Sequence, residues 1–332
     1  MRLLWLPINT PQSANVFRYC LDLKTLHATV YDNYMTVIGS SANNDFNLDS
    51  KSQDLGWDLH CHTLYSDGTK TPKELVDEAK NLGLSGVAIS DHDTTAGWHD
   101  FEEAAKNADF PVIFGSEITS VEGNISVHVL AYNYNPNDEC INEMFATTRK
   151  RRLERTRKMV DLMSHDFPIT WQDVLAQAGQ GELTTIGRPH IADALVAAGV
   201  FETRSQAFAG PVAPRGPYYI PTPSPSVDEV IKVIKHAGGV SVIAHPADYS
   251  RNLVILSDSQ IEHYASVGLN GLEVYHRGNS LTQRQRLLEL AKDLNLLVTG
   301  GSDWHGSGKP NKIGEETTSC NVVSKILNYQ MN

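Results

Sequence analysis

From Gly56 onward, short apolar runs alternate with longer amphipathic segments, and few folds accommodate that order. The apolar runs have the length of buried strands. The segments between them carry helix-start signals, such as Thr71-Pro72-Lys73-Glu74, a capping box with proline at the first helical position. Short buried strands that alternate with helices predict a parallel α/β sheet, either open or closed into a barrel.

The expected strands of this α/β body cover residues 57–63, 87–90, 112–117, 125–132, 240–244, 271–275 and 296–299. One expected helix begins after the Thr71 signal and ends at Gly83, and a second begins after the capping signal at Ser226. Further helices are expected near residues 96–107 and 282–294. Residues 56–134 and 226–332 are therefore interpreted as one barrel domain.

Two regions depart from this pattern. Residues 135–225 are nearly all helical in pattern and end in a proline-rich stretch, which indicates a helical insertion or cap on the α/β body. Residues 1–55 form an N-terminal extension, which could contain a strand pair at 28–31 and 35–38 or be weakly ordered. The sequence leaves both descriptions of the extension open.

Composition limits the partners and the location of the protein. Lysine and arginine number 28 against 39 aspartates and glutamates, so the formal net charge is −11. Such a charge disfavours a stable complex with long nucleic acid or an anionic membrane. The four cysteines form no CxxC pair, and no apolar run is long enough for a membrane span. We expect a cytoplasmic protein; the oligomeric state is left open.

Histidines and acids gather at or near the ends of the predicted strands. His60 and His62 share one face of the first strand, because side chains alternate along a strand, and Cys61 points away from them. Similar residues stand at other predicted strands: Asp91, His92, Asp93, Glu117, His128, His245, Asp303 and His305. Because parallel α/β folds place their sites at this edge, we expect a centre for zinc, manganese or iron.

Six short motifs, in order along the chain, resemble those of the PHP (polymerase and histidinol phosphatase) family. They are His60-Cys61-His62-Thr63, Ser66-Asp67-Gly68, Ser90-Asp91-His92-Asp93, Gly115-Ser116-Glu117-Ile118, Ala244-His245-Pro246 and Ser302-Asp303-Trp304-His305. The chain looks most like the stand-alone bacterial metal-dependent phosphoesterases of the family, which act on nucleoside phosphates. The resemblance runs from about residue 57 to about residue 315 and does not cover the extension.

The resemblance implies a distorted (β/α)7 TIM-like barrel with two or three divalent metal ions, of which Mn, Zn, Fe and Mg are the candidates. It assigns His60, His62, Glu117 and Asp303 to one ion, and Asp67, His92 and His305 to a second. Glu117 would bridge to a third ion that His128 and His245 also hold. Asp58, on the same strand face as His60, is a candidate partner for a histidine N–H.

Further residues are expected to act on the substrate. Arg188-Pro189-His190 resembles a family motif that contacts substrate phosphate, although it would also suit the start of a helix. His276-Arg277, after the predicted strand 271–275, is a second substrate-binding candidate. The general acid is expected to be Asp93 or His190. Residues 149–158 carry seven cations and one anion, a pattern typical of a solvated helix face that could also serve a polyanionic substrate.

The implied reaction is hydrolysis of a phosphate monoester by a hydroxide that two metal ions share. The implied substrates are small nucleotides, namely AMP or nucleoside 3′,5′-bisphosphates, and also the 5′ ends of short RNA. The alternatives are a histidinol-phosphate phosphatase, a metal-binding regulatory module without turnover, and an enzyme that hydrolyses C–N bonds. The third usually needs a carbamylated lysine on a strand, and no lysine stands at a predicted strand end.

Overall fold

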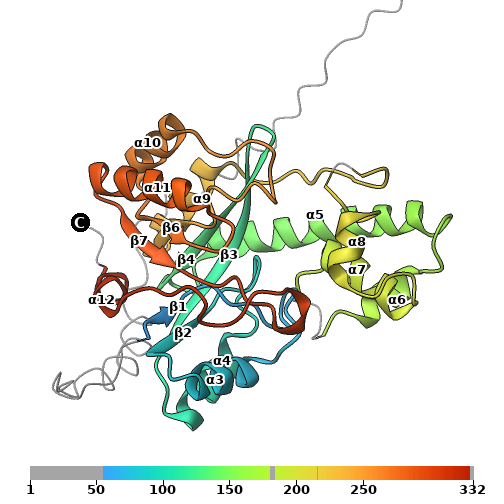
Figure 1. Ribbon diagram of the computed structural model, residues 1–332, viewed down its shortest axis with the longest axis horizontal. Helices are drawn as coiled ribbons and strands as arrows, with labels where there is room; N and C mark the ends of the chain where they lie inside the picture. The colour runs from blue at the N-terminus through green and yellow to red at the C-terminus, as the bar shows by residue number, and fades with distance from the viewer. Residues whose placement is uncertain (1–54, 180–183, 215, 330–332) are drawn as a thin grey trace, which may run out of the picture. The chain divides into compact units, whose positions relative to one another are not determined.

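In the part of the chain that the structure describes, seven strands form a single sheet and follow one another in the order in which they occur along the chain (Figure 1). The computed structural model describes residues 55–179, 184–214 and 216–329, so the strand pair considered at 28–31 and 35–38 lies outside the described residues. The strands are β1 (Trp57–Asp58), β2 (Gly86–Ile89), β3 (Val112–Glu122), β4 (Ile125–Tyr132), β5 (Val240–Ile243), β6 (Gly271–Tyr275) and β7 (Leu297–Gly300).

The two edges of the sheet approach each other just beyond β1 and β7. Cys61 and Trp304 form a parallel bridge, in which the amide of His62 donates to the carbonyl of Trp304 at 2.8 Å. The amide of Trp304 donates in turn to the carbonyl of His60 at 3.2 Å. The sheet is therefore a nearly closed barrel, and the predicted barrel fold is confirmed.

The direction of β4 corrects the prediction of an all-parallel sheet. β3 and β4 pair antiparallel from Gly115 with Tyr132 to Glu122 with Ile125, and β4 also runs antiparallel to β5. Because the two strands form a hairpin, β3 continues to Glu122, five residues beyond the end expected at Glu117. Glu117 consequently lies in the middle of β3, and His128 lies in the first half of β4.

The first strand is shorter than expected, and a buried carboxylate explains why. β1 ends at Asp58, whose Oδ1 accepts hydrogen bonds from the amides of His60 and Ser302. Its Oδ2 accepts a hydrogen bond from the amide of Gly314. These bonds satisfy backbone donors that a continued strand would have paired with its neighbours.

Helices cover the barrel, and their starts follow the local signals in the sequence. They are α3 (Pro72–Asn81), α4 (Trp98–Ala108), α9 (Val227–His236), α10 (Asp258–Val267), α11 (Leu281–Asp293) and α12 (Cys320–Leu327), with a short 3-10 turn, η1 (Gly306–Gly308). Both predicted capping boxes, at Thr71 and Ser226, are present. α10 and α12 were not predicted.

Alternate side chains of the strands pack into two apolar clusters, one on each face of the sheet. Val87 of β2 packs with helix residues such as Leu75 and Phe101, whereas its neighbour Ala88 packs with Leu130 and Val242 of other strands. Val323 and Ile326 of α12 join this second cluster. The barrel thus has a filled interior, and its functional groups have to lie at an edge.

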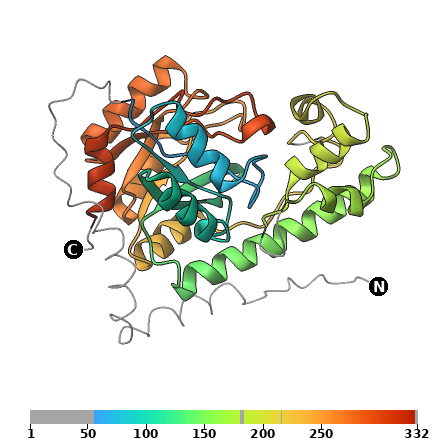
Figure 2. The same ribbon diagram turned by 90° about the horizontal axis from the view of Figure 1, so that it is seen from below.

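Within the described residues, the segment between β4 and α9 contains four helices: α5 (Glu139–Met163), α6 (Trp171–Ala176), α7 (Arg188–Ala197) and α8 (Arg204–Ala209). α5 is the long helix that carries the chain from the barrel to the other three, as Figure 2 shows. Residues of α5, α6, α7 and α8 form a separate apolar cluster that includes Met159, Val174, Ile191 and Ala207. No helix within the described residues is long and apolar enough to cross a membrane.

Candidate metal centre

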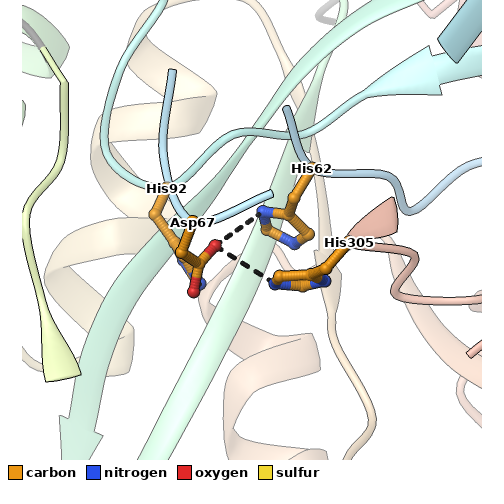
Figure 3. A group of neighbouring side chains, drawn as sticks. All are labelled: His62, Asp67, His92 and His305. Atoms are coloured by element: carbon orange, nitrogen blue, oxygen red, sulfur yellow. Dashed lines mark ion pairs between the residues drawn. The ribbon is translucent and has the colours of Figure 1, made fainter. Parts of the chain in front are cut away.

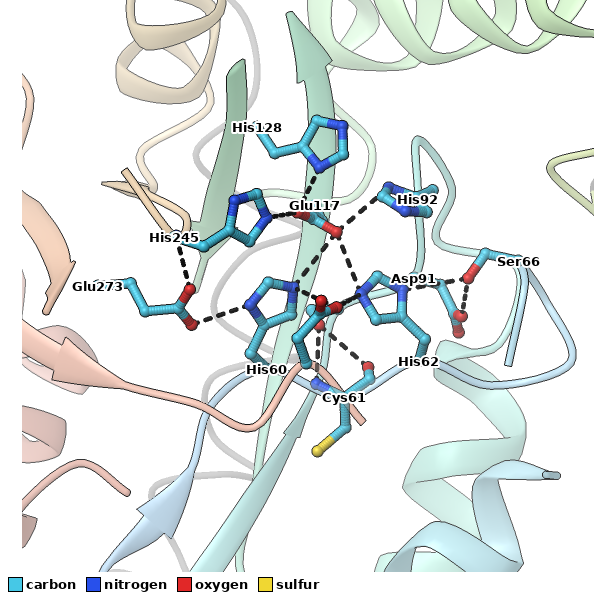
Figure 4. Close-up of polar contacts among 12 residues, drawn as sticks. His60, Cys61, His62, Ser66, Asp91, His92, Glu117, His128, His245 and Glu273 are labelled. Carbon is cyan, nitrogen blue, oxygen red and sulfur yellow. Dashed lines mark hydrogen bonds and ion pairs between the residues drawn. The ribbon is translucent and has the colours of Figure 1, made fainter. Parts of the chain in front are cut away.

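Glu117 is buried at the centre of a cluster of imidazoles, all of them buried except that of His128, which is partly exposed (Figure 4). Its Oε2 lies 3.2 Å from His60 Nε2, 3.1 Å from His62 Nε2 and 3.3 Å from His92 Nδ1. Its Oε1 lies 2.6 Å from His128 Nδ1 and 3.0 Å from His245 Nε2. One carboxylate from the middle of β3 therefore contacts five histidines that come from four separate parts of the chain.

Asp303 contributes the second carboxylate of this cluster. Its Oδ1 lies 3.5 Å from His60 Nε2 and 3.4 Å from His62 Nε2. With Glu117, these residues form a group of four buried side chains whose potential ligand atoms lie within 4.8 Å of one another. This is the same set that the family resemblance assigns to one ion.

Asp67, His92 and His305 converge on the other side of His62, as Figure 3 shows. Asp67 Oδ1 lies 3.1 Å from His305 Nε2 and 3.7 Å from His62 Nδ1, and Asp67 Oδ2 lies 3.8 Å from His92 Nε2. His62 thus presents its two ring nitrogens to two different acidic groups. The third group contains His92, Glu117 and His128.

The structure therefore brings together all nine side chains that were expected to bind metal. His128 reaches the cluster because β4 is antiparallel, so the first half of this strand lies at the edge where the parallel strands end. His245 follows β5 directly, as expected.

The buried atoms at the centre are those that a divalent cation would satisfy. Seven of them have no hydrogen-bond partner among the described residues: His60 Nε2, His62 Nε2, Asp67 Oδ1, His92 Nδ1, Glu117 Oε2, Asp303 Oδ1 and His305 Nε2. Buried polar atoms without a partner are rare and costly in folded proteins. Imidazole and carboxylate ligands without thiolates fit zinc, manganese or iron, so the residues present fit the expected metal ions.

The protonation states favour metal binding at most of these groups. Burial opposes ionisation of Glu117, but the neighbouring histidines hold the pKa of its carboxyl well below the usual value. Burial lowers the pKa of His92 and His245 well below the ordinary value, which keeps both rings neutral. For His62, burial is outweighed by contacts with Asp303 and Glu117, which raise its pKa to about 9. A metal ion at His62 would therefore have to displace a proton.

Glu273, which the sequence did not single out, orients His60. Its Oε1 lies 2.9 Å from His60 Nδ1, and its Oε2 accepts a hydrogen bond from the amide of His245 at 2.8 Å. With Nδ1–H donated to Glu273, Nε2 is the nitrogen of His60 that faces Glu117 and Asp303. Burial opposes ionisation of this ring, but the three neighbouring carboxylates raise the pKa of His60 well above its ordinary value, so a metal ion at Nε2 also has to displace a proton. Asp58 does not have the role expected of it, because it accepts hydrogen bonds from backbone amides and the imidazole of His60 is held by Glu273.

Two cations that the sequence also did not single out contact Asp303. Arg251 Nη2 donates to Asp303 Oδ2 at 2.8 Å, and Lys309 Nζ donates to the same oxygen at 2.7 Å. Arg251 also lies 3.2 Å from His128 Nδ1. These contacts leave Asp303 Oδ1 directed at His60 and His62.

The backbone at the centre adopts unusual conformations. Asp93, His245 and Asp303 have positive φ angles of 52°, 32° and 53°. Non-glycine residues rarely adopt this left-handed region, and such residues cluster at functional sites. Two of the three are expected ligands, and the third follows His92.

The structure places the proposed substrate-binding residues in different surroundings, and not all of them lie beside the centre. His276 is 2% exposed, and its Nε2 lies 3.9 Å from Asp303 Oδ2, so it borders the centre. Arg277 instead forms an ion pair with Glu315, with 3.3 Å between Nη1 and Oε1. The guanidinium of Arg188 lies 5.6 Å from the ring centroids of both Phe208 and Tyr219.

The two candidates for the general acid differ in how their polar atoms are engaged. Asp93 is fully buried and accepts hydrogen bonds from the amide of Thr119 at 2.9 Å and from its hydroxyl at 2.7 Å. His190 Nδ1 accepts a hydrogen bond from the amide of Gly187 at 3.1 Å, which makes Nε2 the protonated nitrogen. Because both oxygens of Asp93 are engaged, His190 is the better placed of the two.

A nearly closed α/β barrel with several imidazoles and acids at one edge defines a metal-dependent hydrolase. A family model described as PHP domain matches residues 58–178. The 5′-3′ exoribonuclease Rnm of Salmonella typhimurium is 31% identical over 252 residues, which cover 75% of this chain and 85% of that protein. The chain belongs to the PHP domain family and is a hydrolase that acts on phosphoester bonds.

Two further relatives support this assignment. The 3′,5′-nucleoside bisphosphate phosphatase of Chromobacterium violaceum is 28% identical over 253 residues, which cover 76% of this chain and 88% of that protein. The crystal structure of a predicted metal-dependent phosphoesterase from Bifidobacterium adolescentis is 58% identical, with a TM-score of 0.82. That comparison covers 83% of this chain and 97% of the other.

Proposed function

We propose that the protein hydrolyses phosphate monoesters of nucleotides, and that the nine clustered side chains hold two or three divalent metal ions for this reaction. The candidate substrates are AMP, nucleoside 3′,5′-bisphosphates and the 5′ ends of short RNA. The observation that carries the proposal is the convergence of unpartnered imidazole and carboxylate atoms on Glu117. The names of the relatives from Salmonella typhimurium and Chromobacterium violaceum support nucleotides as the substrate class.

Divalent ions bound at such a centre lower the pKa of a water molecule and offset negative charge on phosphate oxygens. In this proposal His60, His62, Glu117 and Asp303 hold one ion, and Asp67, His92 and His305 hold a second. Glu117 and His128 hold a third, together with His245. Which of Mn, Zn, Fe and Mg occupies each position stays a prediction.

The surrounding residues position these ligands and the substrate. Glu273 holds the His60 ring in one orientation, and the two cations at Asp303 Oδ2 hold that carboxylate. His190 presents a protonated Nε2, which could donate to a phosphate oxygen or to the leaving alcohol. Arg188 would bind phosphate through its planar guanidinium fork.

The acidic net charge of −11 supports a small substrate over a stable complex with long nucleic acid. A cytoplasmic location stays a prediction. The division into an extension, a barrel of residues 56–134 and 226–332 and a cap of residues 135–225 is likewise proposed. The separate apolar cluster of α5 to α8 supports this cap.

The test is release of inorganic phosphate by the manganese-loaded protein from AMP, a nucleoside 3′,5′-bisphosphate, histidinol phosphate and an aryl phosphate. We expect a nucleotide to have the highest kcat/KM. Asp303→Asn should abolish turnover while circular dichroism stays unchanged, because asparagine tolerates the left-handed backbone at this position. A preference for histidinol phosphate, or full activity of the Asp303 variant, would overturn the proposal.

A further inference from the structure

Two side chains of the cap donate hydrogen bonds to backbone carbonyls of expected metal ligands. Thr185, which lies three residues before α7, donates from Oγ1 to the carbonyl of His92 at 2.5 Å. Arg204, the first residue of α8, donates from Nη1 to the carbonyl of Asp67 at 2.9 Å. Both of these ligands are expected to hold the second ion, together with His305 (Figure 3). We call Thr185 and Arg204 the cap donors.

The side chain of Arg204 is fixed from its other side by Asp193 of α7. Arg204 Nε donates to Asp193 Oδ1 at 2.7 Å, and Arg204 Nη2 donates to Asp193 Oδ2, so the pair is bidentate. Arg204 Nη1 also lies against Gly308 of η1, where an added Cβ would overlap it. Because a guanidinium is planar and a bidentate pair fixes its plane, Nη1 stays directed at the Asp67 carbonyl.

Thr185 joins the two loops that carry these ligands. It is fully buried, and its backbone amide donates to the carbonyl of Tyr65 at 3.2 Å. Tyr65 lies two residues before Asp67, whereas His92 lies in the loop after β2. One buried residue of the cap therefore bonds to both loops.

The ligands of the first ion are held by residues of the barrel instead. Glu273 of β6 holds His60, and Arg251 and Lys309 hold Asp303. Within the described residues, the hydrogen bonds from the cap to expected ligands are those of the two cap donors. The contacts of the cap are thus directed at the second ion group.

The geometry of the second ion group depends on these two loops. Asp67 Oδ2 lies 3.8 Å from His92 Nε2, and Asp67 Oδ1 lies 3.1 Å from His305 Nε2. Imidazole and carboxylate ligands lie about 2.0–2.2 Å from a bound zinc ion, so a displaced loop would remove a ligand from its site. Residues that orient metal ligands from outside typically change metal affinity by about 10- to 100-fold.

The same helices carry His190, the better placed of the two candidates for the general acid. His190 and Asp193 are three residues apart on α7, so they share one side of that helix. Burial lowers the pKa of His190, and the negative charge of Asp67 acts against this effect. The contact between Asp193 and Arg204 therefore links the helix of His190 to the loop of Asp67.

We propose that the cap donors position Asp67 and His92, so that binding of the second ion depends on the cap whereas binding of the first ion does not. This inference rests on the proposed function, because it concerns the metal ions that this function requires. Thr185 and Arg204 are positioning residues, since each acts through the backbone of a ligand and touches neither the ions nor the substrate.

The test is manganese titration of the metal-free full chain against a competing chelator, which measures metal affinity without any substrate. Thr185→Val removes the hydroxyl donor at a similar volume and should weaken one class of bound ion by about tenfold. The affinity of the remaining ions should stay within about twofold. Thr185→Ser keeps the hydroxyl and should restore the lost affinity, and Arg204→Gln should have an effect like that of Thr185→Val.

Double variants identify the affected ion. Arg204→Gln should cause no further loss in the Asp67→Asn protein, which already lacks a ligand of the second ion, but a loss of about tenfold in the Asp303→Asn protein. Thr203→Ala is the matched control, because it removes the N-terminal cap of α8 next to Arg204 without removing a contact to a ligand. It should leave every affinity unchanged. Equal weakening of all ions, the same loss in Thr203→Ala, or unchanged affinities in Thr185→Val and Arg204→Gln would overturn the inference.

The titration also separates this inference from the proposed function. Selective loss of one ion in a protein that hydrolyses no nucleotide would retain the coupling to the cap and refute the proposed function. Unchanged affinities in both variants of a protein that does hydrolyse nucleotides would refute the coupling alone. A chain that binds no manganese would refute both.

Discussion

Glu273→Gln is the substitution that most directly tests how the centre is organised. Glu273 is 1% exposed, and its two oxygens serve two donors, the Nδ1–H of His60 and the amide of His245. Glutamine has nearly the same shape but only one acceptor oxygen. One of the two donors would therefore face an NH₂ group, or His60 would change tautomer and present Nε2–H to the metal site.

The size of the effect follows from these two contacts. A hydrogen bond to a charged group contributes about 1.5–3 kcal/mol, and loss of one of the two corresponds to about 10- to 150-fold in an equilibrium constant. Outer partners of metal-binding histidines affect metal affinity by about 10- to 100-fold, which is a similar range. We therefore expect Glu273→Gln to weaken metal binding by about 10- to 100-fold.

Competition with a chelator measures this affinity directly, and urea unfolding of the metal-free protein shows whether the fold is retained. Glu262→Gln, at an exposed position of α10, is the matched control and should bind metal like the unchanged protein. If Glu273→Gln binds manganese within about twofold of the unchanged protein, the orienting role of Glu273 is wrong.

Three further predictions concern the same fold and centre. Gly301→Ala should lower the free energy of unfolding in urea by about 1–3 kcal/mol and weaken metal binding, because the new Cβ would overlap the Cβ of His60. An unchanged free energy of unfolding would contradict this and show that the loop relaxes freely. Thr71→Ala should cost about 0.5–2 kcal/mol in urea unfolding, because it removes the capping box of α3, without changing metal affinity. Since His62 has a pKa of about 9 and must lose its proton to bind metal, chelator competition should show affinity falling from pH 9 to pH 7; a flat profile would contradict this.

Much of the fold was predictable because its signals are local. The capping boxes at Thr71 and Ser226 start α3 and α9 where expected, and β4 and β6 have the predicted bounds. Each of these features depends on residues within one turn of helix or one strand. The positions of His92, His245 and Asp303 just beyond strand ends follow from the same local pattern.

The antiparallel β4 was missed although a signal for it was present. Only Gly123 and Asn124 separate β3 from β4, and two-residue connections of this type are typical of β-hairpins. Gly123 has a φ of 55°, as such a tight turn requires. An interpretation of residues 112–132 as a hairpin would have placed Glu117 and His128 near each other from the sequence alone.

Other parts of the centre depend on contacts between residues that are far apart in the sequence, and no local pattern predicts such contacts. Glu273 is a single carboxylate within the apolar strand Gly271–Tyr275, and its partner His60 is 213 residues away in the sequence. The charged run that contains Arg152 and Arg155 is typical of a solvated helix, yet the fold buries Arg152 and the Nε atom of Arg155. Arg251 and Lys309 likewise reach Asp303 from loops.

The bridge between Cys61 and Trp304 has a consequence for the order in which the protein becomes functional. Residues 60–62 leave the ribosome well before Asp303 and His305, which follow them along the sequence after about 240 residues. A nascent chain therefore carries several metal-binding histidines long before their remaining partners exist. The first ion group in particular cannot be completed until Asp303 has been added.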